Sequence, residues 1–230
     1  LLVYRLFINQ GKNLIDRYYL ISGAGNFEIR LVGWDKITDA LADPKRGCIL
    51  LTAHMGNWQV VMTALMRLGR AVCLLMRPED NPAVQESLRI SQEASRIKVV
   101  SPNGFLGNVV ELIRSLNEGW IVSIMGDRSY DFSSTEIRFL GGTARFPHGA
   151  FALAAATGCP VVVLLATKMA VARYDLEVCG VLWPRYIAGI EKQAQLQGWA
   201  QEFAGMLEAF VERHPLECFL FQDIWSGGRT

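Results

Sequence analysis

The sequence predicts an α/β fold in which a central mixed, largely parallel sheet is flanked by helices. Apolar runs of strand length alternate along the chain with segments whose apolar residues recur at helical spacing, a pattern typical of parallel sheets. The 230 residues, 51% of them hydrophobic and 20% charged, suffice for one sizeable core. We therefore expect a single domain that comprises residues 1–230.

The first half of the chain alternates helices and strands. Apolar residues recur at helical intervals over 6–20, whereas 27–32 alternates in the manner of a strand. The segment 34–42 predicts a short helix that an Asp-Pro pair ends. The apolar run from Cys48 then stops at His54, after which helical spacing resumes. Further strands are expected at 71–76, 97–100 and 120–125, and further helices at 83–96 and 106–116.

The second half begins with the polar, Gly-rich segment 129–145, which we interpret as a loop around a short strand at 137–140. Phe146-Pro147-His148-Gly149 then opens an Ala-rich helix that runs to Thr157. A Gly-Cys-Pro break divides the apolar tract 150–166, so this tract predicts a helix followed by a strand rather than a membrane span. The remaining elements are strands at 161–167, 174–181 and 218–221 and an amphipathic helix at 191–212.

Charge and cysteine content exclude several classes of protein. Lysine plus arginine (23) nearly balance aspartate plus glutamate (22), so no global field favours a nucleic acid partner. The five cysteines are scattered without metal-binding spacing, which indicates reduced thiols in a cytoplasmic environment, and neither a metal nor a cofactor is expected. Residues 1–8 are apolar but too short to span a bilayer, which leaves open that they end a longer membrane segment.

Polar residues follow three of the expected strands. They are His54, the pair Asp127 and Arg128, and the helix-opening turn 146–149. Each also has a purely structural interpretation, as a core histidine, a surface salt bridge and a helix start. Because ligands of open α/β sheets bind beyond the carboxyl ends of the strands, we expect the three to converge on one crevice if their strands are neighbours. A helix N-terminus near Arg128 would also suit a phosphate or an oxyanion.

Four ordered blocks of residues carry a family resemblance. The pattern His-x4-acid is weak by itself, but four blocks in order are fairly specific. The blocks are His54-Met-Gly-Asn57-Trp58-Gln59, Gly126-Asp127-Arg128, the stretch from Phe139 to Gly149, and the stretch from Phe219 to Trp225. On these blocks the chain resembles the lysophospholipid acyltransferase superfamily, and within it the bacterial lipid A late acyltransferases, over about residues 7–226.

The resemblance implies a glycerol-3-phosphate acyltransferase-like fold and a definite reaction. A fatty acyl group would pass from a thioester of acyl carrier protein or coenzyme A to a hydroxyl or amine of a lipid acceptor, with His54 as general base. Asn57, backbone N–H groups of the turn or Arg128 would stabilise the oxyanion, or Arg128 would hold a phosphate. The other implied substrate-binding residues are Trp58, Gly126, Phe146, Pro147 and Gly149.

A membrane location follows from the implied substrate. We expect the protein at the cytoplasmic face of the bacterial inner membrane, held peripherally or by a single anchor, with the membrane surface as a partner. An apolar groove should lead from the bilayer to His54. Candidates for its wall, each also interpretable as ordinary core, are Leu6, Phe7, Tyr18, Tyr19, Phe105 and Phe132.

The chain departs from the family at Gln59. The family places an acid there, which orients the histidine and stabilises its cation, and in the serine-protease dyad the same amide swap lowers turnover roughly ten-thousand-fold. Three interpretations are open: an engineered replacement of glutamate, substitution by another acid such as Asp127, or an inactive or very slow enzyme. We favour the first, because Asn57 and Trp58 keep the family pattern and glutamine is the isosteric replacement.

Two other functions stay open. One is a non-catalytic protein that binds lipid or acyl carrier protein on the same fold. The other is an acyl thioesterase that uses His54 with water as the acceptor. For an acyltransferase, the acceptor stays open among a lipid A precursor, a lysophospholipid, an aminolipid and a pigment headgroup.

Overall fold

A seven-stranded sheet forms the centre of the protein. The computed structural model describes residues 1–21, 25–58, 60–61, 69–76, 97–101, 105–128, 133–221 and 223–225. The strand order is β1-β9-β8-β2-β5-β3-β4, in which β8 and β9 pair antiparallel and all other neighbours pair parallel. This confirms the mixed, largely parallel sheet. The strands are β1 (Glu28–Val32), β2 (Cys48–Thr52), β3 (Val72–Leu75), β4 (Ile97–Val100), β5 (Ile121–Met125), β8 (Val161–Ala170) and β9 (Arg173–Leu182).

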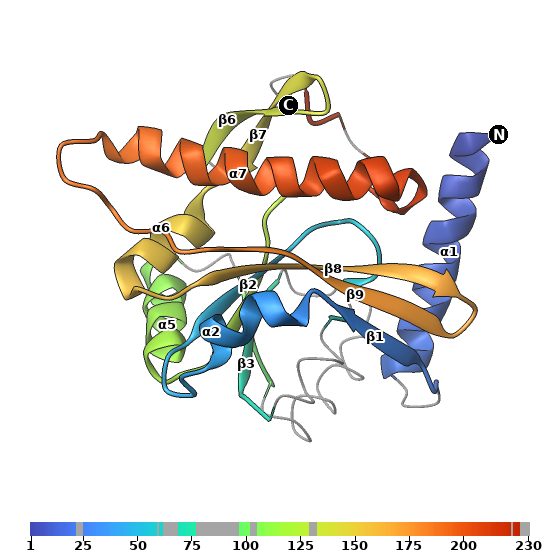
Figure 1. Cartoon of the computed structure of the whole chain (residues 1–230), viewed down its shortest axis with the longest axis horizontal. Helices are drawn as coiled ribbons and strands as arrows, with labels where there is room; N and C mark the ends of the chain where they lie inside the picture. Colours follow the sequence, from blue (N-terminus) through green and yellow to red (C-terminus); the bar gives the residue numbers. More distant parts are fainter. Residues whose placement is uncertain are drawn as a thin grey trace.

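Helices cover both faces of this sheet, as Figure 1 shows. On one face α5, α6 and α7 pack with a two-stranded hairpin, β6–β7, around Phe151 and Phe203. On the other face η1 and α2 bury Ile37 and Ala40, and α1 stands at the edge of the sheet. The helical elements are α1 (Leu2–Ile21), η1 (Trp34–Ile37), α2 (Thr38–Leu41), α5 (Phe105–Asn117), α6 (Gly149–Thr157), α7 (Lys192–Arg213) and η2 (Pro215–Glu217).

Strand β2 lies in the middle of the sheet because every one of its side chains is apolar or small and buried. Ile49 and Leu51 join the core on the α7 side, and Cys48 and Leu50 join the core on the other side. Its neighbour β5 runs parallel in register, so that Thr52 is opposite Met125. The residues that follow these two strands therefore leave the sheet side by side.

The segment 129–145 corrects one expectation. Instead of a loop around one short strand, the structure has an antiparallel hairpin of β6 (Ser134–Phe139) and β7 (Gly142–Pro147). Leu140 and Gly141 form its two-residue turn with φ of 48° and 82°, the left-handed conformation that tight hairpin turns need. Leucine is unusual in such a turn, which hid the hairpin in the sequence.

Two further expectations also differ from the structure. Phe146 and Pro147 belong to β7, so the helix that follows begins at Gly149 rather than at Phe146. The strand expected at 218–221 is wrong: within it Cys218 makes a single isolated bridge, to Met55. The helix expected at 83–96 lies outside the described residues.

Candidate functional site

The turn that follows β2 is held by backbone contacts on two sides. The N–H of Gly56 donates to the C=O of Glu217 at 2.7 Å, and the N–H of Asn57 donates to the C=O of Ala166 at 3.0 Å. Gly56 has φ +62°, and a Cβ there would lie 1.6 Å from the carbonyl oxygen of Ala166. Only glycine therefore allows the backbone to pass so close to β8. This turn fixes the direction in which His54 leaves the sheet.

His54 is paired with Asp127, which follows the neighbouring strand β5. The Nδ1 of His54 lies 2.8 Å from Oδ1 of Asp127, and the backbone N–H of His54 donates to Oδ2 of Asp127 at 2.6 Å. One carboxylate thus holds both the ring and the backbone of the same residue. Two of the three strand ends expected to converge do so, and they bring His54 and Asp127 together.

The pairing defines the chemistry that His54 can perform. Asp127 is fully buried, whereas the His54 side chain is 24% exposed. A carboxylate accepts hydrogen bonds, so Nδ1 of the neutral ring carries the proton and Nε2 keeps its lone pair. Among the described residues, Nε2 has no hydrogen-bond partner. A histidine held in this way by a buried acid has the geometry that general-base chemistry requires.

The C-terminal segment after η2 closes over both strand ends. The N–H of Phe219 donates to the C=O of His54 at 2.9 Å, and Nη2 of Arg128 donates to the C=O of Phe219 at 3.2 Å. The Nε of Arg128 is buried and has no hydrogen-bond partner among the residues that the structure describes. Phe219 therefore links the two predicted site residues, and the guanidinium of Arg128 keeps an N–H donor without an acceptor among those residues.

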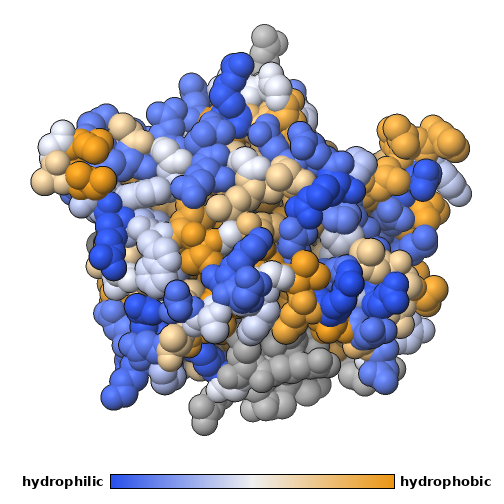
Figure 2. Space-filling view, in the orientation of Figure 1, coloured by the Kyte–Doolittle hydropathy of each residue, from blue (hydrophilic) through white to orange (hydrophobic). Residues whose placement is uncertain are grey.

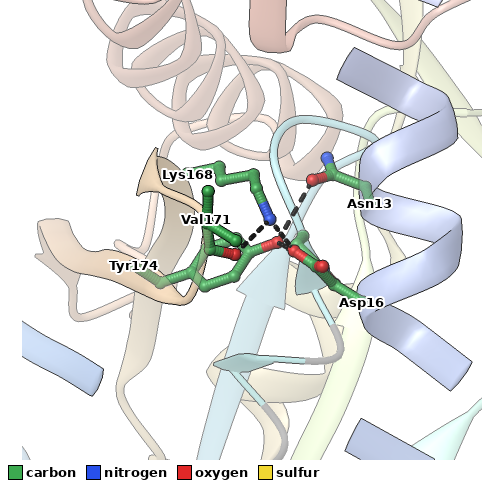
Figure 3. A network of polar contacts seen from close by, with 6 residues as sticks. Asn13, Asp16, Lys168, Val171 and Tyr174 are labelled. Carbon is green, nitrogen blue, oxygen red and sulfur yellow. Dashed lines mark hydrogen bonds and ion pairs between the residues drawn. The ribbon is translucent and has the colours of Figure 1, made fainter. Parts of the chain in front are cut away.

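Asn57 points into the protein. Its side chain is 1% exposed, and Nδ2 donates to the hydroxyl of Tyr174 at 3.1 Å. That hydroxyl donates to Asp16 and also lies 3.3 Å from Oδ1 of Asn13 (Figure 3). The turn after His54 is thus tied to α1 through Tyr174. Burial, together with the hydrogen bond to Asp16, raises the pKa of Tyr174. The amide of Asn57 thus braces the turn from the core side.

The other expected site residues are spread over the fold. Trp58 is half-buried against the core that contains Val60 and Val61. Gly126 is buried, and a Cβ there would lie 2.7 Å from the side chain of Leu51. Phe146 is 0% exposed and belongs to the core, where its ring centroid lies 6.0 Å from that of Phe203 in α7.

The remaining expected residues lie at the end of the hairpin, at the start of α6 and outside the described residues. Pro147 ends β7 and Gly149 begins α6. Gln59 lies outside the described residues. Within the parts of the chain that are described, no cluster of three or more His, Cys, Asp or Glu residues is arranged to hold a metal ion.

Sequence reasoning missed the residues that hold the site from a distance. Glu217 supplies a backbone carbonyl to Gly56, and Tyr174 supplies a hydroxyl to Asn57. Neither stands in a recognisable motif, since each acts through one hydrogen bond across a long sequence separation. The tyrosine hydroxyl amid the apolar pattern of 174–181 was the one available signal, because a buried hydroxyl needs a partner.

Comparison of the chain with known proteins identifies a family and a similar structure. The sequence model of the family described as bacterial lipid A biosynthesis acyltransferase matches residues 24–226. A search of curated proteins finds no match. The crystal structure of the 1-acyl-sn-glycerophosphate (LPA) acyltransferase PlsC from Thermotoga maritima is similar at 15% identity and a TM-score of 0.47, covering 91% of this chain and 79% of that one.

Proposed function

Since the chain belongs to the bacterial lipid A biosynthesis acyltransferase family, we propose that it transfers a fatty acyl group from a carrier thioester to a hydroxyl or amine of a lipid, with His54 as general base. The observation that carries the assignment of the base is the pairing of His54 with the buried Asp127 at 2.8 Å. The reaction class follows from the family, and the catalytic roles follow from this geometry.

The first step is attack by the acceptor. Nε2 of His54 takes the proton of the acceptor hydroxyl or amine while its oxygen or nitrogen forms a bond to the thioester carbonyl carbon. The ring becomes an imidazolium, whose positive charge the carboxylate of Asp127 offsets. Asp127 thereby performs the orienting and stabilising role that the family assigns to the position of Gln59. The origin of Gln59 does not affect this role.

The second step releases the carrier. The tetrahedral intermediate collapses, the carbon–sulfur bond breaks, and the leaving thiolate takes the proton from His54. The negative oxygen of the intermediate needs donors nearby, and we assign this role to Arg128, which directly follows Asp127 and whose guanidinium donates to the C=O of Phe219. Atoms balance without a covalent enzyme intermediate: one thioester and one acceptor give one acyl lipid and one thiol.

The proposal also covers the acyl donor, the acceptor and the place of the reaction. Acyl carrier protein or coenzyme A supplies the thioester, and the acceptor is a lipid A precursor or another lysolipid presented at the cytoplasmic face of the inner membrane. Within the described segments, no helix is both long enough and apolar enough to cross a bilayer.

An acyl-transfer assay tests the proposal. The chain is incubated with radiolabelled acyl-carrier thioester and a mixed bacterial lipid extract, and the products are separated by chromatography. A labelled lipid that is lost in His54→Ala and much reduced in Asp127→Asn is the expected result. The mass of the labelled lipid then identifies the acceptor.

The same assay separates the two alternatives. A thioesterase would release free fatty acid as the main product although an acceptor lipid is present, and would depend on His54 in the same way. A non-catalytic protein would bind thioester or lipid without turnover, and would do so equally in His54→Ala. Either result would overturn the acyltransferase assignment.

A further inference from the structure

Helix α1 buries two polar side chains and exposes many of its apolar ones. Asn13 and Asp16, one helical turn apart, are 6% and 8% exposed and face the protein. Leu14, Ile15 and Tyr18 are 53%, 59% and 71% exposed. A helix that lies on a protein core in water normally shows the reverse distribution. The outer face of α1 is therefore suited to an apolar surrounding.

This outer face continues along the whole helix. Exposed apolar and aromatic residues recur at intervals of three, four and seven, which places them on one broad side. Figure 2 shows apolar atoms gathered over the N-terminal end of α1. The residues of this outer face, called the α1 face below, are Val3, Tyr4, Phe7, Ile8, Leu14, Ile15, Tyr18 and Tyr19.

The exposed charged residues of α1 are all basic. Its basic residues are Arg5, Lys12 and Arg17, of which the first two are exposed. Its single acid, Asp16, is buried and paired with Lys168 of β8. An apolar face bordered by basic residues is the composition of helices that lie in the interface of an anionic bilayer.

The turn between β8 and β9 is joined to α1 and exposes further apolar side chains. Met169 is 45% exposed, and Val171, at the tip, is 88% exposed. Lys168 joins this turn to α1, since its Nζ donates to the C=O of Val171 at 3.0 Å and also pairs with Asp16 (Figure 3). The helix and the hairpin tip are thus held together by one lysine, and Arg173 adds an exposed positive charge beside the tip.

We propose that the α1 face and the β8–β9 tip form one docking surface for an anionic lipid bilayer. The apolar side chains enter the interface, and Arg5, Lys12 and Arg173 contact the headgroups. The proposal rests on the proposed function, because a lipid acceptor must reach His54 from a bilayer. The two are also connected in the structure, since Tyr174 contacts both Asp16 and the Asn57 of the turn that carries His54.

Vesicle flotation tests the docking surface. The purified chain is mixed with vesicles of phosphatidylcholine containing phosphatidylglycerol, or of phosphatidylcholine alone, and the floated fraction is measured at low and high salt. We expect binding to the anionic vesicles that salt weakens. Val171→Asp removes an apolar contact at the exposed tip and adds a negative charge, and should weaken binding about tenfold.

Val110→Asp is the matched control. Val110 is 63% exposed on α5, at the other end of the molecule from α1 (Figure 1). This variant should bind vesicles as the unmodified chain does, and both variants should keep the thermal unfolding midpoint, because both sites are exposed. Equal vesicle binding by Val171→Asp and the unmodified chain, or equal binding to neutral and anionic vesicles, would overturn the proposal.

Two further measurements keep the alternatives apart. If gel filtration shows a dimer that Val171→Asp dissociates while vesicle binding is absent, a second copy of the chain covers the surface and the bilayer is excluded. Acyl transfer to a detergent-dispersed acceptor tests the proposed function separately. Val171→Asp should keep that activity, and a chain that docks on vesicles but transfers no acyl group would refute the function and leave the docking surface intact.

Discussion

The carboxylate of Asp127 contacts His54 at two atoms: Oδ1 lies 2.8 Å from the ring Nδ1, and Oδ2 lies 2.6 Å from the backbone nitrogen. The backbone contact matters because it fixes the main chain from which the ring projects. The residue two positions after β5 therefore holds His54 in orientation, and in the proposed mechanism it also supplies the charge that offsets the cation.

Removing that charge tests the role of Asp127. Asp127→Asn keeps the size of the side chain but cannot offset the imidazolium, so we expect kcat to fall roughly a hundred- to ten-thousand-fold with a much smaller change in KM. Steady-state acyl transfer measures both constants. If kcat changes less than about tenfold, Asp127 holds the backbone only and the charge comes from elsewhere.

Restoring the family acid is a separate test. Because Asp127 already pairs with His54, Gln59→Glu should raise turnover by far less than the roughly ten-thousand-fold expected if the dyad lacked an acid. The assay is the same acyl transfer at saturating donor. A gain approaching that size would mean that the acid at position 59 is essential and that Asp127 does not replace it. In that case Gln59 marks a disabled form of the enzyme.

The turn after His54 should tolerate no side chain at Gly56. Gly56→Ala would place a Cβ 1.6 Å from the carbonyl oxygen of Ala166 at a φ of +62°, so the turn must move and activity should be lost. Gly69→Ala is the control, because Gly69 has φ +67° but nothing within 4 Å of the added Cβ. It should cost only about 1–2 kcal/mol of stability. Thermal unfolding and acyl transfer distinguish the two variants, and equal losses in both would contradict the close approach to β8.

Glu217 should make stability depend on pH. Burial raises its pKa from 4.5 to about 7, against the influence of Asn13, Lys168 and Lys12. Between these values the folded state binds more protons than the unfolded state, so stability should fall as pH rises from about 4.5 to 7, by up to about 3 kcal/mol.

Glu217→Gln removes this titration. The variant should unfold at a higher denaturant concentration than the unmodified chain at pH 8, and the difference should shrink toward pH 5. Glu202→Gln, at an exposed position of α7, is the control and should leave the pH profile as it is. A Glu217→Gln profile parallel to that of the unmodified chain would show that Glu217 titrates normally.

The sequence by itself determined the layers of the fold and the place of the site. Apolar strand runs with polar residues at their ends specify a parallel sheet, and His54 and Asp127 stand at the ends of two such runs. These features are local, since they depend on the spacing of residues within one element. The same reasoning failed for the hairpin of β6 and β7, whose Leu-Gly turn carries no usual turn signal.

The tertiary structure alone decided which of these residues touch. His54 and Asp127 are 73 residues apart, and only the pairing of β2 with β5 brings them together. In the same way, Asn57 faces Tyr174 rather than open solvent, and Phe146 packs in the core. The order of strands in a sheet and the direction of a side chain depend on contacts between distant segments, so spacing along the chain does not determine them.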